Sequence, residues 1–351
     1  MKKFSQKVAL TFLALSTLGL SVQVMAATPK EIRISVSAAG EGGKPKVGGS
    51  FVASAHLRGV LEQEFKKDGI KVSWLFFPGA GPATNEALAN GKVDFALQGD
   101  LPSLVGRSTG LKTKVLFSTG RFGPTYVVVP ADSNVKSFAD LKGKKFSIFK
   151  GTNGQITFNR VLEKYGFTER DLRVISQDAY SARTSLATGD IDATITSPFS
   201  LASRGVAKTL LEIKDPKVAP IAHFWVTENF EKQYPEVTQR VVTKLIEQAK
   251  WSSEEANRVT QYKLWAQSGI PLLDYQKTWD GWNLKDRNTP LLDDFHRTQI
   301  ESAAVIAKQA RLLRRDVDTK TWYEPKYLNN ALKDLNLTGY WRQFNANGQP
   351  K

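Results

Sequence analysis

Two glycine-rich loops carry the residues of this sequence that are best suited to bind a ligand. The first spans residues 79–82 (GAGP) and the second spans residues 151–155 (GTNGQ), and each comes between a predicted strand and a predicted helix. Such a junction presents free backbone N–H groups and a partial positive charge, which together favour an oxyanion. A plain turn with Pro82 at the first helical position explains the first loop equally well. Helix capping by Thr152 or Asn153 is the alternative for the second.

The composition gives little support to catalysis or to metal binding. The chain has no cysteine, which excludes disulfides and thiolate chemistry, and its three histidines (His56, His223 and His296) are far apart in the sequence. No G-x-S-x-G elbow occurs, and the dinucleotide fingerprint G-x-G-x-x-G is incomplete because Thr84 replaces the third glycine. We therefore predict no enzymatic activity, no cofactor and no metal.

The charge balance is strongly basic. The 351 residues contain 49 Lys+Arg against 34 Asp+Glu, a formal net charge of +15. Such a field favours anionic partners, although the basic residues are scattered, as on an ordinary solvated surface. The densest group, Arg311, Arg314 and Arg315, ends a helical pattern where cations suit the helix dipole. We expect no nucleic-acid partner.

The N-terminus has the pattern of a secretory signal peptide. Three lysines precede an apolar run at residues 8–20, and residues 24–26 (VMA) offer small side chains for cleavage after Ala26 or Ala27. A buried N-terminal helix is the alternative. Without cysteine a lipid anchor is not expected, and no later stretch reaches the ~18 apolar residues of a membrane span. The sequence thus predicts a signal peptide at residues 1–26 and a periplasmic protein.

Strands and helices alternate over the first two thirds of the chain. Predicted strands at residues 32–36, 70–77 and 93–97 enclose helices at residues 50–67 and 82–88, and the plan repeats between residues 126 and 195. After residue 228 the pattern is mostly helical. Residues 88–94 (LANGKVD) and 186–192 (LATGDID) echo each other, and each leads through a strand into a proline-bearing loop, at residues 98–102 and 196–199. We predict two similar α/β lobes with parallel sheets, and a ligand beyond the strand C-termini.

Several segments resemble one known family. Residues 72–102 (VSWLFFPGAGPATNEALANGKVDFALQGDLP) are similar to a run in periplasmic aliphatic-sulfonate-binding proteins, which belong with the nitrate and taurine receptors of ABC transporters. Residues 127–151, 189–193 and 322–328 extend the likeness over nearly the whole chain after the signal peptide. The resemblance implies a two-lobed periplasmic-binding-protein fold (type II) with a cleft between mostly parallel sheets. Lobe 1 would comprise residues 27–118 and 223–351, and lobe 2 residues 119–222.

The resemblance also implies residues that would hold an anionic ligand. From lobe 1 these are Ser37, Gly40, Gly81, Gly99 and Asp100, and from lobe 2 they are Thr152, Asn153, Gln155 and Ser181. The family often has an aromatic residue, Asp and Pro where this chain has Thr196-Ser197-Pro198, so the Ser197 hydroxyl replaces an acid there.

Further candidates come from the residues themselves. Arg121, in the junction with Thr119 and Gly120, could offer a bidentate fork to a sulfonate, or could be an exposed hinge charge. Trp225 could line the cleft or belong to the core.

We therefore predict the monomeric, periplasmic solute-binding component of an ABC importer. It would capture an alkyl or aryl sulfonate or a sulfate ester and deliver it to a permease in the inner membrane. Another small solute (nitrate, taurine, an aromatic carboxylate or a pyrimidine) is an alternative. An enzyme on the same scaffold is a further one, against which the absence of cysteine and the isolated histidines argue.

Overall fold

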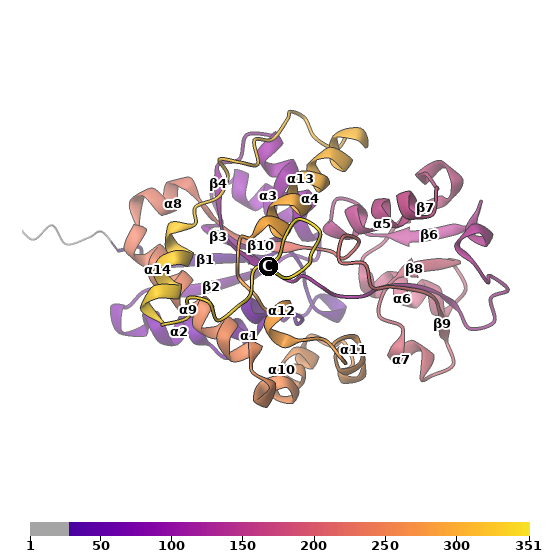
Figure 1. Ribbon diagram of the computed structural model, residues 1–351, viewed down its shortest axis with the longest axis horizontal. Helices are drawn as coiled ribbons and strands as arrows, with labels where there is room; N and C mark the ends of the chain where they lie inside the picture. The colour runs from indigo at the N-terminus through magenta and orange to yellow at the C-terminus, as the bar shows by residue number, and fades with distance from the viewer. Residues whose placement is uncertain (1–27) are drawn as a thin grey trace, which may run out of the picture.

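The chain is built around two five-stranded sheets. The computed structural model describes residues 28–351 (Figure 1), so the predicted signal peptide at residues 1–26 lies outside the described residues. The first sheet has the order β2-β1-β3-β10-β4. Its strands are β1 (Glu31–Val36), β2 (Lys71–Phe76), β3 (Phe95–Gly99), β4 (Thr113–Thr119) and β10 (Ala222–Thr227).

The second sheet repeats the topology of the first. Its order is β7-β6-β8-β5-β9. Its strands are β5 (Thr125–Pro130), β6 (Lys145–Ile148), β7 (Arg173–Ser176), β8 (Ala193–Ile195) and β9 (Ala207–Ile213). In each sheet the fourth strand, β10 or β5, is antiparallel to both of its neighbours. The predicted pair of α/β lobes with mostly parallel sheets is confirmed.

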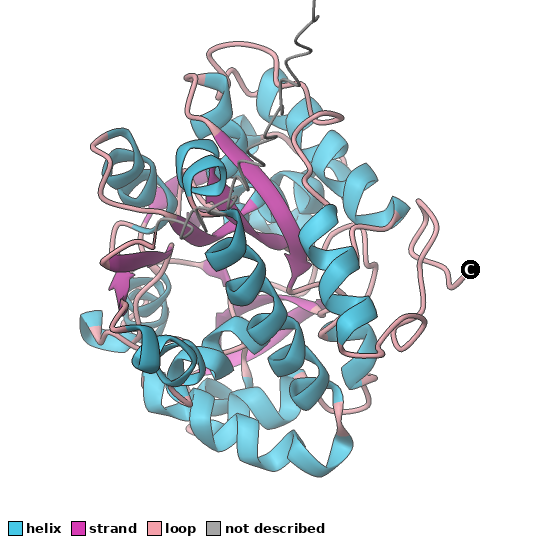
Figure 2. Cartoon of the chain, turned by 90° about the vertical axis from the view of Figure 1, so that its left-hand side faces the viewer, coloured by secondary structure: helices cyan, strands magenta, loops and turns pink. Residues whose placement is uncertain are grey.

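Helices surround both sheets (Figure 2). The first lobe, built on the β1 sheet, carries α1 (Phe51–Leu57), α2 (Val60–Phe65), α3 (Ala80–Ala89), α4 (Asp100–Ser108), α8 (Glu228–Gln233), α9 (Pro235–Ser253), α10 (Arg258–Trp265), α11 (Leu272–Thr278), α12 (Leu284–Arg287), α13 (Asp294–Gln309) and α14 (Lys326–Asp334). The second lobe, built on the β6 sheet, carries α5 (Asn153–Lys164), α6 (Ala179–Ala187) and α7 (Phe199–Ala202). Short 3-10 helices occupy residues 41–43, 66–68, 138–141, 169–171, 255–257 and 266–268.

Two local predictions were wrong, and the backbone shows why. The single helix expected at residues 50–67 begins as predicted, with Ser50 Oγ accepting a hydrogen bond from Ala53 N at 3.1 Å. It is interrupted at Gly59, whose φ of 64° lies in the left-handed region. We expected a loop at residues 98–102, but residues 98 and 99 are the end of β3 and residues 100–102 form the first turn of α4. Pro102 is tolerated there because the first turn needs no N–H donor from it.

The core of the first lobe contains an aromatic stack. The rings of Phe95 and Phe117 lie on either side of Phe224, with centroid distances of 5.7 and 5.0 Å. All three side chains are fully buried. They come from β3, β4 and β10, so this packing joins the returning strand β10 to strands more than a hundred residues earlier in the chain.

Two connections, residues 120–124 and 214–221, join the sheets. At the first, the Arg121 guanidinium donates to both carboxylate oxygens of Asp293 at 2.8 and 2.9 Å. Arg121 is 2% exposed, so it is not the exposed hinge charge that we considered. Nearby, Arg160 of α5 donates to the Gln299 carbonyl at 3.1 Å, which ties the second lobe to α13 of the first.

Two buried histidines lie next to this junction. The ring centroids of His223 and His296 are 5.9 Å apart, and none of their ring nitrogens has a hydrogen-bond partner among the described residues. Burial lowers the pKa of His223 to about 3, and burial followed by the charge of Arg121 holds the pKa of His296 well below its ordinary value. Both rings are therefore neutral at neutral pH.

We expect the protein to lose stability as the pH falls from about 6.5 towards 3. In that window the unfolded chain binds protons at His223 and His296 that the folded protein does not bind. Burial also lowers the pKa of His56, which adds to the loss. Asp100 and Glu62 act in the opposite direction, because burial raises the pKa of both, that of Asp100 to about 6. His223→Gln removes one titrating ring. Its free energy of unfolding, measured by urea denaturation between pH 6.5 and 4, should vary less with pH than that of the unaltered protein. The same dependence on pH in both proteins would show that His223 does not cause the loss of stability.

Candidate functional site

A cavity of about 640 Å³ lies between the two lobes. The first lobe contributes residues 37–43, the turn before α3, and residues of α11. The second lobe contributes the beginnings of α5 and α6 and residues 194–197, which include the end of β8 and the two residues after it. The loops that follow β1, β2, β6, β7 and β8 thus meet around one space, as expected beyond the strand C-termini of open α/β sheets.

The first-lobe wall is positioned by hydroxyl contacts and by a strained turn. Ser37, directly after β1, donates from Oγ to Thr84 Oγ1 of α3 at 2.9 Å. Ala80, the first residue of α3, has a φ of 52°, a left-handed conformation that is rare for a residue with a Cβ. This turn places the start of α3 at the cavity, where its first backbone N–H groups have no partner within the helix.

The second-lobe wall begins with α5. The Thr152 hydroxyl accepts a hydrogen bond from Gly154 N at 3.2 Å and donates to the Phe149 carbonyl at 2.7 Å, so it caps the helix. The Gln155 side chain accepts from Gly151 N at 2.8 Å and is turned towards its own loop. Asn153, the first residue of α5, lines the cavity. The beginning of a twelve-residue helix therefore lies at the cavity, and its dipole favours an anion there.

The start of α6 is occupied by a carboxylate. Asp178 accepts hydrogen bonds from Tyr180 N at 2.9 Å, from Ser181 N at 3.1 Å and from the Ser181 hydroxyl at 2.6 Å. Burial opposes the charged form, but the hydrogen bonds from Ser181 and Tyr180 hold the pKa of Asp178 below its ordinary value. An anion is therefore not expected at α6, which distinguishes it from α5.

The remaining charges of the cavity largely compensate one another. Arg183 lies 3.3 Å from an oxygen of Asp274 and 4.0 Å from one of Glu41. The apolar part of the wall includes Phe149 and Trp279. The cavity thus combines neutral donors at the starts of α3 and α5 with ion-paired groups and aromatic surface elsewhere.

The structure brings together five of the residues predicted for ligand binding. These residues line the cavity: Ser37, Gly40, Thr152, Asn153 and Ser197. Three others lie at contacts within or between the lobes. A Cβ on Gly99 would lie 2.6 Å from Asn153 Cβ, one on Gly81 would lie 2.2 Å from Pro102 Cβ, and Asp100 is fully buried with an oxygen 4.0 Å from Arg160 Nη1.

The other predicted residues are engaged within the protein. Thr119 and Gly120 lie at the junction of the lobes, where Arg121 forms a buried ion pair with Asp293. The Gln155 and Ser181 side chains make the local hydrogen bonds described above. Trp225 is 1% exposed and donates from Nε1 to Gln98 Oε1 at 2.9 Å, so it belongs to the core.

Four charged residues of the cavity were missed by the sequence analysis: Glu41, Asp178, Arg183 and Asp274. Trp279 is 3% exposed and also contributes to the wall. No local signal marks Asp274, because it lies on α11, far along the chain from the glycine-rich loops.

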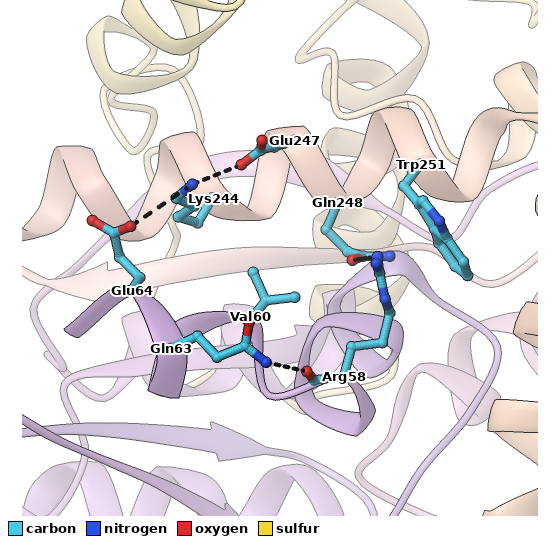
Figure 3. Close-up of a pocket in the computed structure, with 8 residues that line it drawn as sticks. All are labelled: Arg58, Val60, Gln63, Glu64, Lys244, Glu247, Gln248 and Trp251. Carbon is cyan, nitrogen blue, oxygen red and sulfur yellow. Dashed lines mark hydrogen bonds and ion pairs between the residues drawn. The ribbon is translucent and has the colours of Figure 1, made fainter. Parts of the chain in front are cut away.

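A second hollow, of about 450 Å³, lies on the first lobe between α9 and the α1–α2 segment (Figure 3). The Arg58 guanidinium lies over the Trp251 ring at 4.1 Å and donates to Gln248 Oε1 at 2.6 Å. Lys244 is paired with Glu247 at 2.9 Å and with Glu64 at 3.7 Å. No residue predicted for ligand binding lies here, so the cavity between the lobes is the candidate site.

The described part of the chain contains neither a metal-binding cluster nor a helix that could span a membrane. Within residues 28–351, His, Asp and Glu side chains form no group of three or more that could hold a metal ion. Over the same residues, none of the helices combines the length and apolar character needed to cross a membrane.

The lobes can approach each other at Gly99 because glycine has no side chain there. Its φ of −75° suits any residue, but an added Cβ would meet Asn153 of the opposite lobe. Gly99→Ala should therefore leave the melting temperature nearly unchanged while it pushes the lobes apart and weakens ligand binding about tenfold. Calorimetric titration of the variant and of the unaltered protein with the same ligand measures the affinity, and a thermal melt of both measures the stability. Unaltered affinity would show that the lobes need not approach so closely.

The fold and the cavity place the chain in a known structural class. The crystal structure of a protein named as the periplasmic sulfonate-binding protein of a sulfonate ABC transporter, from Methylobacillus flagellatus, matches with a TM-score of 0.77 and 29% identity. The match covers 90% of this chain and 98% of that one. This is the two-lobed α/β fold of periplasmic binding proteins.

The sequence identifies the family. Residues 64–252, more than half of the chain, match the family described as NMT1/THI5 like, and the protein belongs to it. A Bacillus subtilis protein named as an aliphatic sulfonates-binding protein is 25% identical over 290 residues, which cover 81% of this chain and 86% of the relative.

The same fold also occurs in an enzyme. The crystal structure of the desulfurization enzyme DszB matches with a TM-score of 0.65 and 16% identity, over 88% of this chain and 100% of that one. At this identity the likeness concerns the fold alone, so the scaffold by itself does not separate binding proteins from enzymes.

Proposed function

We propose that this protein is the periplasmic solute-binding component of an ABC importer and that it captures an organosulfur anion, either an alkyl or aryl sulfonate or a sulfate ester. The observation that carries the proposal is the cavity between the lobes, with the start of α5 and its neutral donors on one side and aromatic surface on another. The names of the similar proteins from Bacillus subtilis and Methylobacillus flagellatus support the ligand class. The predicted signal peptide supports export.

Neutral donors are sufficient to hold such a head group. A sulfonate oxygen at the start of α5 would accept hydrogen bonds from the Asn153 amide and from backbone N–H groups, with Ser37 opposite on the first lobe. A helix N-terminus stabilises an anion without a full counter-charge. The organic tail would lie along Phe149 and Trp279. Closure of the lobes removes the head group from water and gives the form that docks on the permease.

The cavity favours a receptor over an enzyme. The protein has no cysteine, and neither His56 nor the buried pair His223 and His296 lines the cavity. The carboxylates of the cavity wall are held by hydrogen bonds or ion pairs, as shown for Asp178 and Asp274. The described residues of the wall therefore offer neither a histidine nor a cysteine for nucleophilic catalysis.

A calorimetric panel tests the proposal. Alkanesulfonates, aryl sulfonates and aryl sulfates should bind, and taurine, nitrate, sulfate and bicarbonate should bind more weakly or not at all. Stronger binding of nitrate or taurine would assign a different solute to the same fold. Silence across the whole panel would reject the anion assignment, and turnover of a bound ligand would show an enzyme.

A further inference from the structure

A buried carboxylate of the first lobe reaches the second lobe beside the cavity. Asp274 lies on α11, and its side chain is 2% exposed. One carboxylate oxygen accepts hydrogen bonds from the Ser197 hydroxyl at 2.8 Å and from Ser200 N at 3.0 Å. The other accepts from the Ser200 hydroxyl and from the Arg183 guanidinium, the latter at 3.3 Å. All four of these hydrogen bonds therefore cross the boundary between the lobes.

Each of these donors belongs to the second lobe. Arg183 lies on α6, Ser197 follows β8, and Ser200 lies on α7, which packs against α11. Thr278 of α11 adds a further contact, with its Oγ1 atom 3.2 Å from Ser197 Oγ. In Figure 1, α11 extends from the first lobe towards α7. Protein groups alone complete the contact, so it requires no ligand atom.

The contact between Asp274 and the second lobe involves charged groups on both sides. Hydrogen bonds to an ionised carboxylate are roughly twice as strong as those between neutral groups. The Arg183 guanidinium bonds the Ser200 hydroxyl at 2.7 Å and lies 4.0 Å from Glu41 of the first lobe, so it adds a second charged contact between the lobes. Separation of the lobes would break these bonds together, because they share one carboxylate and one guanidinium.

We propose that Asp274 is a positioning residue for ligand binding, which holds the lobes together in the absence of ligand. The contact raises the population of the closed form, so a ligand spends less of its binding free energy on closure. The ligand effect rests on the proposed function, whereas the effect on lobe separation does not.

The absence of native cysteine allows a direct measurement of lobe separation. Cysteines introduced at the exposed positions Gln276 of α11 and Ala187 of α6 would carry spin labels. Without ligand, the pair should show a short distance population that Asp274→Ala shifts to longer distances. Asp280→Ala, which removes an exposed carboxylate just beyond α11, is the matched control and should leave the distances unchanged.

A second variant tests the contact from the other lobe. Ser200→Ala should also lengthen the distance, and the double variant with Asp274→Ala should add little, because both changes remove one contact. Asp274→Ala should weaken the binding of an alkanesulfonate about tenfold, mainly through faster dissociation. If the distances in Asp274→Ala and Asp280→Ala coincide, or if the parent shows no short population, the proposal is wrong. If no ligand of the panel binds, the proposed function fails, and the distances still decide the role of Asp274.

Discussion

Asp293→Asn should lower the free energy of unfolding by about 3–5 kcal/mol, because it leaves a buried guanidinium without its counter-charge. The side chains of Arg121 and Asp293 are 1% and 0% exposed. Burial already lowers the pKa of Arg121 against the attraction of Asp293. Asp293 also accepts from His296 N at 3.1 Å and from Phe344 N at 3.0 Å, so it joins the first connection between the lobes to α13 and to the C-terminal segment. Urea denaturation measures the loss.

Two companion variants separate charge from packing. Asp316→Asn removes one partner of the exposed pair Lys308–Asp316, whose side chains are 66% and 77% exposed, and should cost less than about 1 kcal/mol. Adding Arg121→Met to Asp293→Asn removes the unpaired charge and should restore part of the lost stability. A loss in Asp293→Asn no larger than that in Asp316→Asn would show that the buried pair does not hold the junction.

Asn153→Asp should abolish sulfonate binding while it leaves the fold intact. The new side chain has the shape of the old one but places a negative charge where the head group of the ligand would lie. Two like charges about 4 Å apart repel by roughly 4 kcal/mol at an effective dielectric constant of about 20, so we expect a loss of at least about a hundredfold. A carboxylate in the first turn of α5 is favourable to the helix dipole, so the melting temperature should stay the same or rise.

Asn329→Asp is the control for this change. It adds the same charge at an exposed position on α14 and should leave the affinity unaltered. Calorimetric titration with one alkanesulfonate compares the three proteins. Binding by Asn153→Asp at the unaltered affinity would place the head group elsewhere, whatever the identity of the ligand.

Local patterns in the sequence were sufficient to predict most of the secondary structure. The alternation of strands and helices, and the echo between residues 88–94 and 186–192, predicted two α/β lobes because burial periodicity and glycine stops are local signals. The edge strands β4 and β9 were missed. Each completes its sheet by pairing with an antiparallel strand, β10 or β5, and this pairing depends on residues far away in the chain.

The candidate site shows the same division between local and non-local information. The glycine-rich loop at residues 151–155 was predicted to open a helix at the ligand, and Thr152 and Asn153 line the cavity. Thr152 also caps α5, as the alternative interpretation predicted. Ligand binding at this loop stays a prediction.

By itself, the sequence determined the absence of thiol chemistry, the repeated strand–loop–helix units and the helix starts that follow them, because composition, periodicity and capping act over a few residues. Only the tertiary structure decided which charges meet. It paired Arg121 with Asp293, 172 residues further along the chain, and brought Asp274 to Ser197, 77 residues away. A buried charge needs a partner wherever the fold can supply one. For this reason Arg121 is buried in the folded protein, and Asp274, which no local pattern marks, lies at the cavity.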